Sequence, residues 1–259
     1  MKIARFTRLV LSLSFTALLL LSAGGERFAA HAQPAPALGP EQTKQIEEVM
    51  RDYLMRHPEV MVEALTAYRQ RKEQDGREAQ KLALKNAQSA LLSDPGSPIG
   101  GNLEGEVSVV EFFDYQCPYC KTASTNLHNL VSEDRGVRVV YKELPILGPP
   151  SMFGAKAALA VARQGMAQYV AFHRALMDNR GPLSEQIVFD VARGLGIDTQ
   201  RLRRDMDHPG VAEQIARNLE LARTLAISGT PAFVIGDELV PGAIGRQELV
   251  RLVAKARGG

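Results

Sequence analysis

Apolar side chains recur at three- and four-residue intervals between residues 41 and 92, a spacing that places them on one face of a helix. Pro58 should end or bend the first helix at about His57, because proline disfavours helical backbone at the residue before it. Residues 69–81 are almost wholly charged or polar, so this section is either a solvated helix or a hinge near Gly76. The pattern predicts a helical arm whose apolar stripe must be buried against something else.

A different pattern begins after the turn-forming residues 93–98. The run rich in valine and phenylalanine that starts at Val107 predicts a buried strand, and the residues after Cys117 favour a helix as far as about Asp134. Apolar and polar side chains alternate over residues 137–144, which predicts the next strand. A strand, helix and strand of these lengths imply that the two strands are parallel.

Residues 145–210 carry only helical patterns, which predicts a helical insertion, and residues 211–227 form one further helix. A strand then leads to Gly236, a hairpin turns at Asp237, and residues 247–256 close the chain as a helix. The expected fold class is α/β, preceded by the helical arm.

The first 32 residues have the pattern of a secretory signal peptide: a basic start, a short apolar run over residues 9–21 and an A-x-A cleavage site at residues 30–32. The apolar run is short for a membrane span, although a retained anchor is the alternative. Without this segment, which holds four basic residues and one acidic residue, the net charge of +2 becomes slightly negative. We therefore expect export, and no nucleic-acid or lipid surface.

The only two cysteines, Cys117 and Cys120, lie where the first strand gives way to a helix. Unpaired N–H groups and the positive end of the helix dipole favour a thiolate at Cys117, which we expect to be the nucleophile. Pro118 suits the first helical turn because its missing N–H is not needed there. Cys120 lies over the same helical face, so it can form a disulfide with Cys117 or resolve a mixed disulfide.

Other uses of the two thiols fit less well. Zinc requires four ligands, and there is no second cysteine pair and no ligand spacing among the scattered histidines His57, His128, His173 and His208. A structural disulfide would close only a four-residue loop and remove little chain entropy. Two thiolates suit Cu(I), but methionine-rich clusters are not evident. We expect redox chemistry, with no metal site and no cofactor.

The order of strand, Cys-Pro-Tyr-Cys helix, strand, helical insertion and Gly229-Thr230-Pro231-Ala232-Phe233 resembles the DsbA-like branch of the thioredoxin superfamily, over about residues 97–257. The resemblance implies that Pro231 is cis and faces the cysteines, and that the backbone of Thr230 pairs with substrate. Pro118 and Tyr119 are then expected to contact substrate as well. From the residues alone, Pro231 would be an ordinary edge-strand proline.

Glu111 is a carboxylate among valines and phenylalanines. Strand alternation could turn it outward to solvent. The resemblance instead implies a buried acid behind Cys120 that helps to move its proton, and burial would raise the pKa of such a carboxyl.

The arm looks like the N-terminal domain of ScsC-type and Com1-like members of this branch, which implies oligomerisation, in some relatives trimerisation, with disulfide isomerase activity. We expect arms of several chains to pack together through residues 41–92; the alternative is that the arm folds back on its own catalytic domain. The expected parts are a signal peptide (1–32), an oligomerisation arm (33–96) and a catalytic domain (97–259).

The sequence thus predicts a periplasmic thiol-disulfide oxidoreductase, an isomerase of disulfides in exported proteins, that works with a membrane redox partner of unknown identity. Three alternatives stay open: a monomeric DsbA-like oxidase, a copper-binding protein connected with copper tolerance, and a non-catalytic scaffold. The Pro118-Tyr119 dipeptide lacks the histidine that stabilises the thiolate in DsbA, which weakens the case for a strong oxidase.

Overall fold

The computed structural model describes residues 38–258, so the expected signal peptide, residues 1–32, lies outside the described residues. By its internal contacts the chain divides into two compact units, one ending at Val62 and the other beginning at Glu63. Within residues 38–258, no helix has the length and apolar character needed to cross a membrane.

The first unit contains helix α1 (Pro40–Arg56), which ends just before His57 as the following proline predicts. None of the residues of α1 is buried, and the apolar side chains of its stripe are exposed to solvent: Ile46, Val49, Met50 and Tyr53. The predicted stripe is therefore an uncovered apolar surface within this unit.

Helix α2 (Glu59–Asn86) runs without interruption through Gly76, so the polar residues 69–81 form a solvated helix. The character of the chain changes after this section, because Leu84, Ala87 and Leu91 are buried in a cluster with residues of the central sheet. The end of α2 and the short helix α3 (Gln88–Leu92) thus pack on the sheet, although we assigned both to the arm.

The described part of the chain forms a five-stranded sheet in the order β1-β3-β2-β4-β5. The central strands β2 (Val107–Phe113) and β3 (Val137–Glu143) are parallel, as predicted, and every other neighbouring pair is antiparallel. The hairpin of β4 (Ala232–Ile235) and β5 (Glu238–Pro241) also agrees with the prediction. Strand β1 (Ile99–Gly101) was not predicted, because three residues with two glycines carry no alternation.

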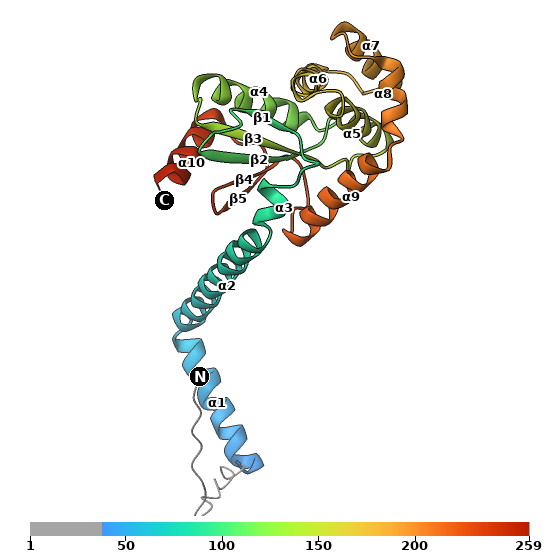
Figure 1. Cartoon of the computed structure of the whole chain (residues 1–259). Helices are drawn as coiled ribbons and strands as arrows, with labels where there is room; N and C mark the ends of the chain where they lie inside the picture. The colour runs from blue at the N-terminus through green and yellow to red at the C-terminus, as the bar shows by residue number, and fades with distance from the viewer. Residues whose placement is uncertain (1–37, 259) are drawn as a thin grey trace, which may run out of the picture. The chain divides into compact units, whose positions relative to one another are not determined.

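Alternation along β2 sends its side chains into two different clusters. Val109 and Phe113 pack with α4 (Pro118–Glu133) and α10 (Arg246–Gly258), whereas Val110 and Phe112 pack with α3 and α9 (Pro209–Thr224). Figure 1 shows α4 and α9 on opposite sides of the sheet. Glu111 shares the side of Val109 and Phe113, which is the side of α4.

The predicted insertion is helical throughout and lies beside the sheet (Figure 1). It consists of α5 (Pro149–Ala162), α6 (Met166–Asp178), α7 (Glu185–Gly194) and α8 (Thr199–Met206). Asp198 caps α8, as its position predicts, by accepting hydrogen bonds from two N–H groups of the first turn.

A buried lysine joins α3 and the loop after it to the sheet. The Lys142 ammonium on β3 donates hydrogen bonds of 2.6 Å to the Ala90 carbonyl and to the Ser97 hydroxyl, and its Nζ lies 3.5 Å from Asp94 Oδ2. Burial lowers the pKa of Lys142, while the Asp94 carboxylate opposes that shift. The contacts compensate for a charge that would otherwise be costly to bury.

Replacing Lys142 by methionine keeps the length of the side chain, but it removes the hydrogen bond to the Ala90 carbonyl and the positive charge beside Asp94. We expect the free energy of unfolding to fall by about 3 kcal/mol, because the hydrogen bonds and the ion pair of a buried ammonium are lost. Urea denaturation measures the effect, with the exposed Lys85→Met on α2 as the control. Equal stability of the two variants would show that the buried lysine does not hold α3 in place.

Candidate active site

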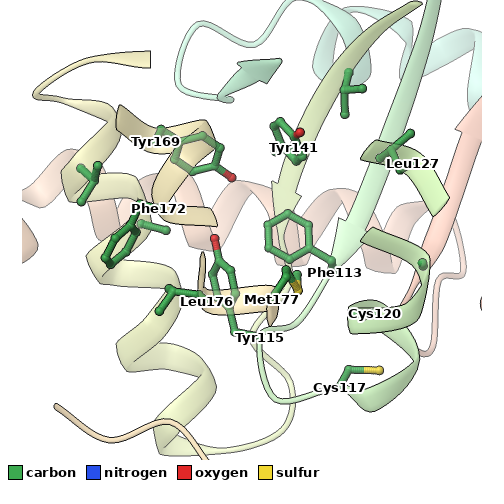
Figure 2. Close-up of a cluster of buried hydrophobic side chains, with 14 of the residues drawn as sticks. Phe113, Tyr115, Cys117, Cys120, Leu127, Tyr141, Tyr169, Phe172, Leu176 and Met177 are labelled. Carbon is green, nitrogen blue, oxygen red and sulfur yellow. The ribbon is translucent and has the colours of Figure 1, made fainter. Parts of the chain in front are cut away.

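The cysteines occupy the positions that the sequence predicts. Cys117 is the N-cap of α4, Pro118 is its first residue, and the Cys120 N–H donates a hydrogen bond to the Cys117 carbonyl at 3.1 Å. Cys117 is 4% exposed and Cys120 is completely buried. Figure 2 shows both at the start of the same helix, next to Phe113 and Tyr115. Cys117 is thus the sulfur closer to solvent, and it lies at the N-terminus of a helix.

The second half of the site comes from a segment more than a hundred residues away in sequence. The Thr230–Pro231 bond is cis, as the resemblance implies, and Pro231 is buried just before β4. The Cys117 thiol donates a hydrogen bond to the Thr230 carbonyl at 3.2 Å. The structure therefore brings the nucleophile candidate against the backbone of the residue expected to pair with substrate.

Glu111 lies at the centre of β2, opposite Tyr141 of β3 and Phe233 of β4. Its side chain is completely buried, and neither of its carboxylate oxygens has a hydrogen-bond partner among residues 38–258. Burial raises the pKa of Glu111 to about 8. Of the two interpretations of the sequence, the outward-facing carboxylate is excluded and the buried acid is observed.

The charge of Glu111 acts on the Cys120 thiol. Burial is the main cause that raises the pKa of the Cys120 thiol, and the charges of Cys117 and Glu111 raise it further. A hydrogen bond with the Asp114 backbone acts in the opposite direction. Cys120 therefore favours the thiol form, and it needs a proton acceptor before it can act as a nucleophile.

Asp114 organises the turn between β2 and α4. Its carbonyl accepts the Cys117 N–H at 3.1 Å, and its buried carboxylate accepts four hydrogen bonds at 2.7–3.1 Å. The four donors are the backbone N–H groups of Gln116, Ile146 and Leu147 and the hydroxyl of Ser151. Sequence analysis missed this residue, although an aspartate directly after a buried strand is typical of a turn held by its side chain.

Beneath this turn lies a buried polar cluster that sequence analysis also missed. The Glu143 carboxylate accepts hydrogen bonds from the hydroxyls of Tyr169, at 2.8 Å, and Tyr115, at 3.3 Å. The Tyr115 hydroxyl also lies 3.1 Å from Nδ1 of His173, whose pKa burial lowers to about 3. Figure 2 shows Tyr115 and Tyr169 facing one another. The cluster ties the insertion helix α6 to the segment leading to Cys117.

The surface around Cys117 is apolar. Tyr119 is 69% exposed, Pro118 is exposed beside it, and Ile146 and Leu147 are exposed on the loop that Asp114 holds. This surface is suited to contact with a polypeptide rather than a small ligand in a closed cleft. Over residues 38–258, no group of three or more histidine, cysteine, aspartate or glutamate side chains is arranged to hold a metal ion.

Comparison with known proteins agrees with this geometry. Residues 108–254 match the DSBA-like thioredoxin domain, which covers more than half of the chain. The protein therefore belongs to the DsbA-like family of thioredoxin-fold proteins, as the motifs predict. Residues 42–74 match the N-terminal domain of the copper resistance protein ScsC.

Among solved structures, the chain is similar to a thioredoxin-like oxidoreductase from Silicibacter pomeroyi DSS-3, with 47% identity, a TM-score of 0.64 and coverage of 66% of this chain and 98% of that one. It is also similar to Proteus mirabilis ScsC in a transitional conformation, with 32% identity, a TM-score of 0.64 and coverage of 86% and 98%.

Among curated proteins, the chain is 25% identical over 185 residues to disulfide bond formation protein D of Bacillus subtilis. The matched residues cover 67% of this chain and 83% of that protein. The curated Na(+)/H(+) antiporter relatives are much longer: the chain spans 25% of the length of the antiporter NhaA 1 of Salinispora arenicola.

The burial of Glu111 should make the free energy of unfolding depend on pH. The folded chain holds the Glu111 proton with a pKa of about 8, whereas the unfolded chain holds it with a pKa of about 4.3. The stabilisation from this proton is therefore complete below about pH 4 and is lost as the pH rises towards the folded pKa. For the reduced protein, the advantage of Glu111→Gln over the native chain should grow by about 5 kcal/mol between about pH 4 and about pH 9.

Urea denaturation at several pH values measures this difference. Glu133→Gln, an exposed substitution at the end of α4, is the control and should leave the pH dependence unchanged. If Glu111→Gln follows the same pH dependence as the native chain, the Glu111 carboxyl is not desolvated in the way the structure indicates.

Proposed function

We propose that this protein reshuffles the disulfides of exported proteins, as a disulfide isomerase whose nucleophile is Cys117. The observation that carries the proposal is the contact between Cys117 at the N-terminus of α4 and the Thr230 carbonyl next to cis Pro231. This contact supports the proposal because it brings the Cys117 sulfur to the backbone of Thr230, the residue expected to pair with an extended substrate.

The reaction begins when the Cys117 thiolate attacks a substrate disulfide. A bond forms between Cys117 Sγ and one substrate sulfur, the substrate S–S bond breaks, and the other substrate sulfur leaves as a thiolate. If that thiolate attacks a different substrate disulfide and a substrate thiol then releases Cys117, the substrate is isomerised without net oxidation. If Cys120 attacks Cys117 instead, the substrate leaves reduced and the cysteine pair is oxidised.

Glu111 serves the second of these outcomes. We assign it the role of the base that takes the proton from Cys120, because both groups are completely buried and the charge of Glu111 acts on the Cys120 thiol, raising its pKa. A base with a pKa of about 8 exchanges protons readily near neutral pH. Pro118, Tyr119 and the Thr230 backbone are assigned to substrate contact.

The arm is assigned to association between chains. It matches the ScsC N-terminal domain over residues 42–74, and its apolar side chains are solvent-exposed in the single chain, with Val49 67% exposed and Met50 57% exposed. Burying such side chains between arms is favourable. An assembly of several chains, such as a trimer, offers several Cys117 sites to one substrate. This suits repeated rearrangement of its disulfides better than a single oxidation.

We place the protein in the periplasm, recharged by a membrane redox partner; the family and the signal-like start support this location. A copper-related role is the second candidate, because the matching arm domain belongs to a copper resistance protein and two thiolates suit Cu(I). Stoichiometric Cu(I) binding without disulfide exchange would favour it over the isomerase.

Charged substitutions on the apolar stripe of α1 should impair disulfide isomerisation in a protein substrate but leave exchange with a small disulfide intact. We expect Val49→Glu/Met50→Glu to reduce the mass of the assembly to that of one chain and to lower the reactivation of scrambled ribonuclease severalfold, because each substrate then meets a single site. Exchange with a small disulfide should be unaffected, since the redox site is unchanged.

Light scattering and the ribonuclease assay measure both effects. Lys44→Glu is the control, because it changes the net charge of α1 by the same amount as the double variant but lies on the polar side of the helix. It should preserve both assembly and isomerisation. Full isomerase activity in a monomeric double variant would contradict the role of the arm. A native protein that only oxidises reduced ribonuclease would be a DsbA-like oxidase.

A further inference from the structure

The residues on either side of the Cys-Pro-Tyr-Cys motif both hold the loop that joins α6 to α7. Gln116, directly before the motif, accepts a hydrogen bond of 2.9 Å at its side-chain oxygen from the Leu183 N–H. Lys121, directly after the motif, donates a hydrogen bond from its ammonium to the Asn179 carbonyl. One end of the loop is thus fixed at each end of the motif, so residues 180–182 lie alongside the redox pair.

Contacts within the loop and with the core hold it in shape. The side-chain amide of Asn179 donates a hydrogen bond of 2.7 Å to the Gly181 carbonyl, and the ring of Pro182 fixes its own backbone φ angle. Leu183 is buried in the same cluster as Tyr115. Because the loop is already ordered, a partner that binds to it loses little affinity to the cost of ordering it.

Arg180 is the exposed charged residue of this loop. The carboxylates that flank it along the chain are paired with other arginines. Asp178 lies 3.9 Å from Arg174. Glu185 accepts a hydrogen bond of 2.7 Å from Arg203. In the part of the chain that the structure describes, no carboxylate lies within ion-pair distance of Arg180. Its guanidinium is therefore available to a carboxylate of another molecule, which it can bind through two parallel hydrogen bonds.

The other exposed groups near Cys117 are apolar. Tyr119 is exposed on the motif itself, and Ile146 and Leu147 are exposed on the loop after β3. The carboxylate of Asp114 is buried and already accepts four hydrogen bonds, so it is not available to a cation of a substrate. A polypeptide that docks here therefore meets apolar side chains and one unpaired positive charge.

We propose that the loop 179–183 is a substrate-binding element and that Arg180 determines specificity, by favouring polypeptides with an acidic residue beside the cysteine that Cys117 attacks. The inference deepens the proposed function and rests on it, because it requires Cys117 to attack a disulfide in a polypeptide. Gln116 and Lys121 are positioning residues, since they act by holding the loop beside the motif.

The step that Arg180 favours is formation of the mixed disulfide. The Cys117 thiolate forms a bond with one substrate sulfur, the substrate S–S bond breaks, and the other sulfur leaves with the electron pair. A substrate carboxylate that pairs with Arg180 increases the rate of productive encounter and holds the disulfide at Cys117. The preference should therefore appear in the rate of this step.

Two peptides of equal length test the preference. Each carries a single cysteine as a 2-thiopyridyl disulfide, flanked by glutamates in one peptide and by lysines in the other. The full-length chain with Cys120→Ser accumulates the mixed disulfide, and attack by Cys117 on the peptide sulfur releases pyridine-2-thione, whose absorbance gives the rate. The rate of each peptide with 2-mercaptoethanol corrects for its intrinsic reactivity.

We expect the acidic peptide to react about fivefold faster than the basic one near physiological ionic strength, and less than about twofold faster in concentrated salt. Arg180→Glu should reverse the preference, because it places a negative charge beside the motif. Arg135→Glu is the control: it makes the same change of charge at an exposed arginine beyond the other end of α4. Because α4 has 16 residues, Arg135 is about 24 Å from Cys117 along the helix, beyond the range of unscreened interaction.

The positioning role has a test of its own. Gln116→Leu removes the acceptor of the Leu183 N–H without changing any charge. If Gln116 holds the loop in place, this variant should lose most of the preference for the acidic peptide although Arg180 is still present. An undiminished preference in Gln116→Leu would refute the positioning role.

The outcomes separate this inference from the proposed function. Failure of the Cys120→Ser chain to form a mixed disulfide with either peptide would refute the proposed function itself. Mixed disulfides formed with both peptides at equal corrected rates, or faster with the basic one, would refute the inference alone. A preference that persists in Arg180→Glu, or that Arg135→Glu alters equally, would contradict the assignment to Arg180.

Discussion

The register of β2 between β3 and β4 is the constraint on which the site depends. Because side chains alternate along a strand, this register directs Val109, Glu111 and Phe113 towards α4, and Val110 and Phe112 towards α3 and α9. A slip of one residue would move Glu111 to the other side of the sheet, away from Cys120. The hydrophobic residues on both sides of Glu111 therefore hold a polar group where hydrophobic packing alone would not put one.

That arrangement lowers stability in exchange for reactivity. The Glu111 carboxylate has no hydrogen-bond partner in the part of the chain that the structure describes, and Cys120 is buried where a thiolate is disfavoured. Each departs from what a stable core requires, and the charge of Glu111 acts on Cys120 in the first turn of α4. Neighbouring departures of this kind are expected at functional sites, where stability is balanced against activity.

The sequence predicted the parts whose signals are local. The α/β class, the parallel strands β2 and β3, the helical insertion and the position of Cys117 at a helix start all follow from periodicity and from one proline. The cis bond at Pro231 and the burial of Glu111 were expected only through the family resemblance. The residues alone also allowed an edge-strand proline and an outward carboxylate.

What could not be predicted depends on partners that the fold supplies. Asp114 bonds to a loop some thirty residues away, and Tyr115, Glu143 and His173 meet only when the insertion packs against the sheet. The end of the arm presents the same difficulty, because nothing in its helical spacing distinguishes side chains that pack on the sheet, such as Leu84, from side chains that remain exposed, such as Leu65.

The central claim is that Cys117 is the sulfur that attacks and Cys120 the one that resolves. Trapping with a disulfide-linked peptide tests it most directly, read by mass spectrometry under non-reducing conditions. Cys120→Ser should accumulate a peptide adduct on Cys117, and Cys117→Ser should form none. An adduct on Cys120 in the Cys117→Ser variant, formed as fast as the adduct on Cys117, would contradict the assignment of the two sulfurs.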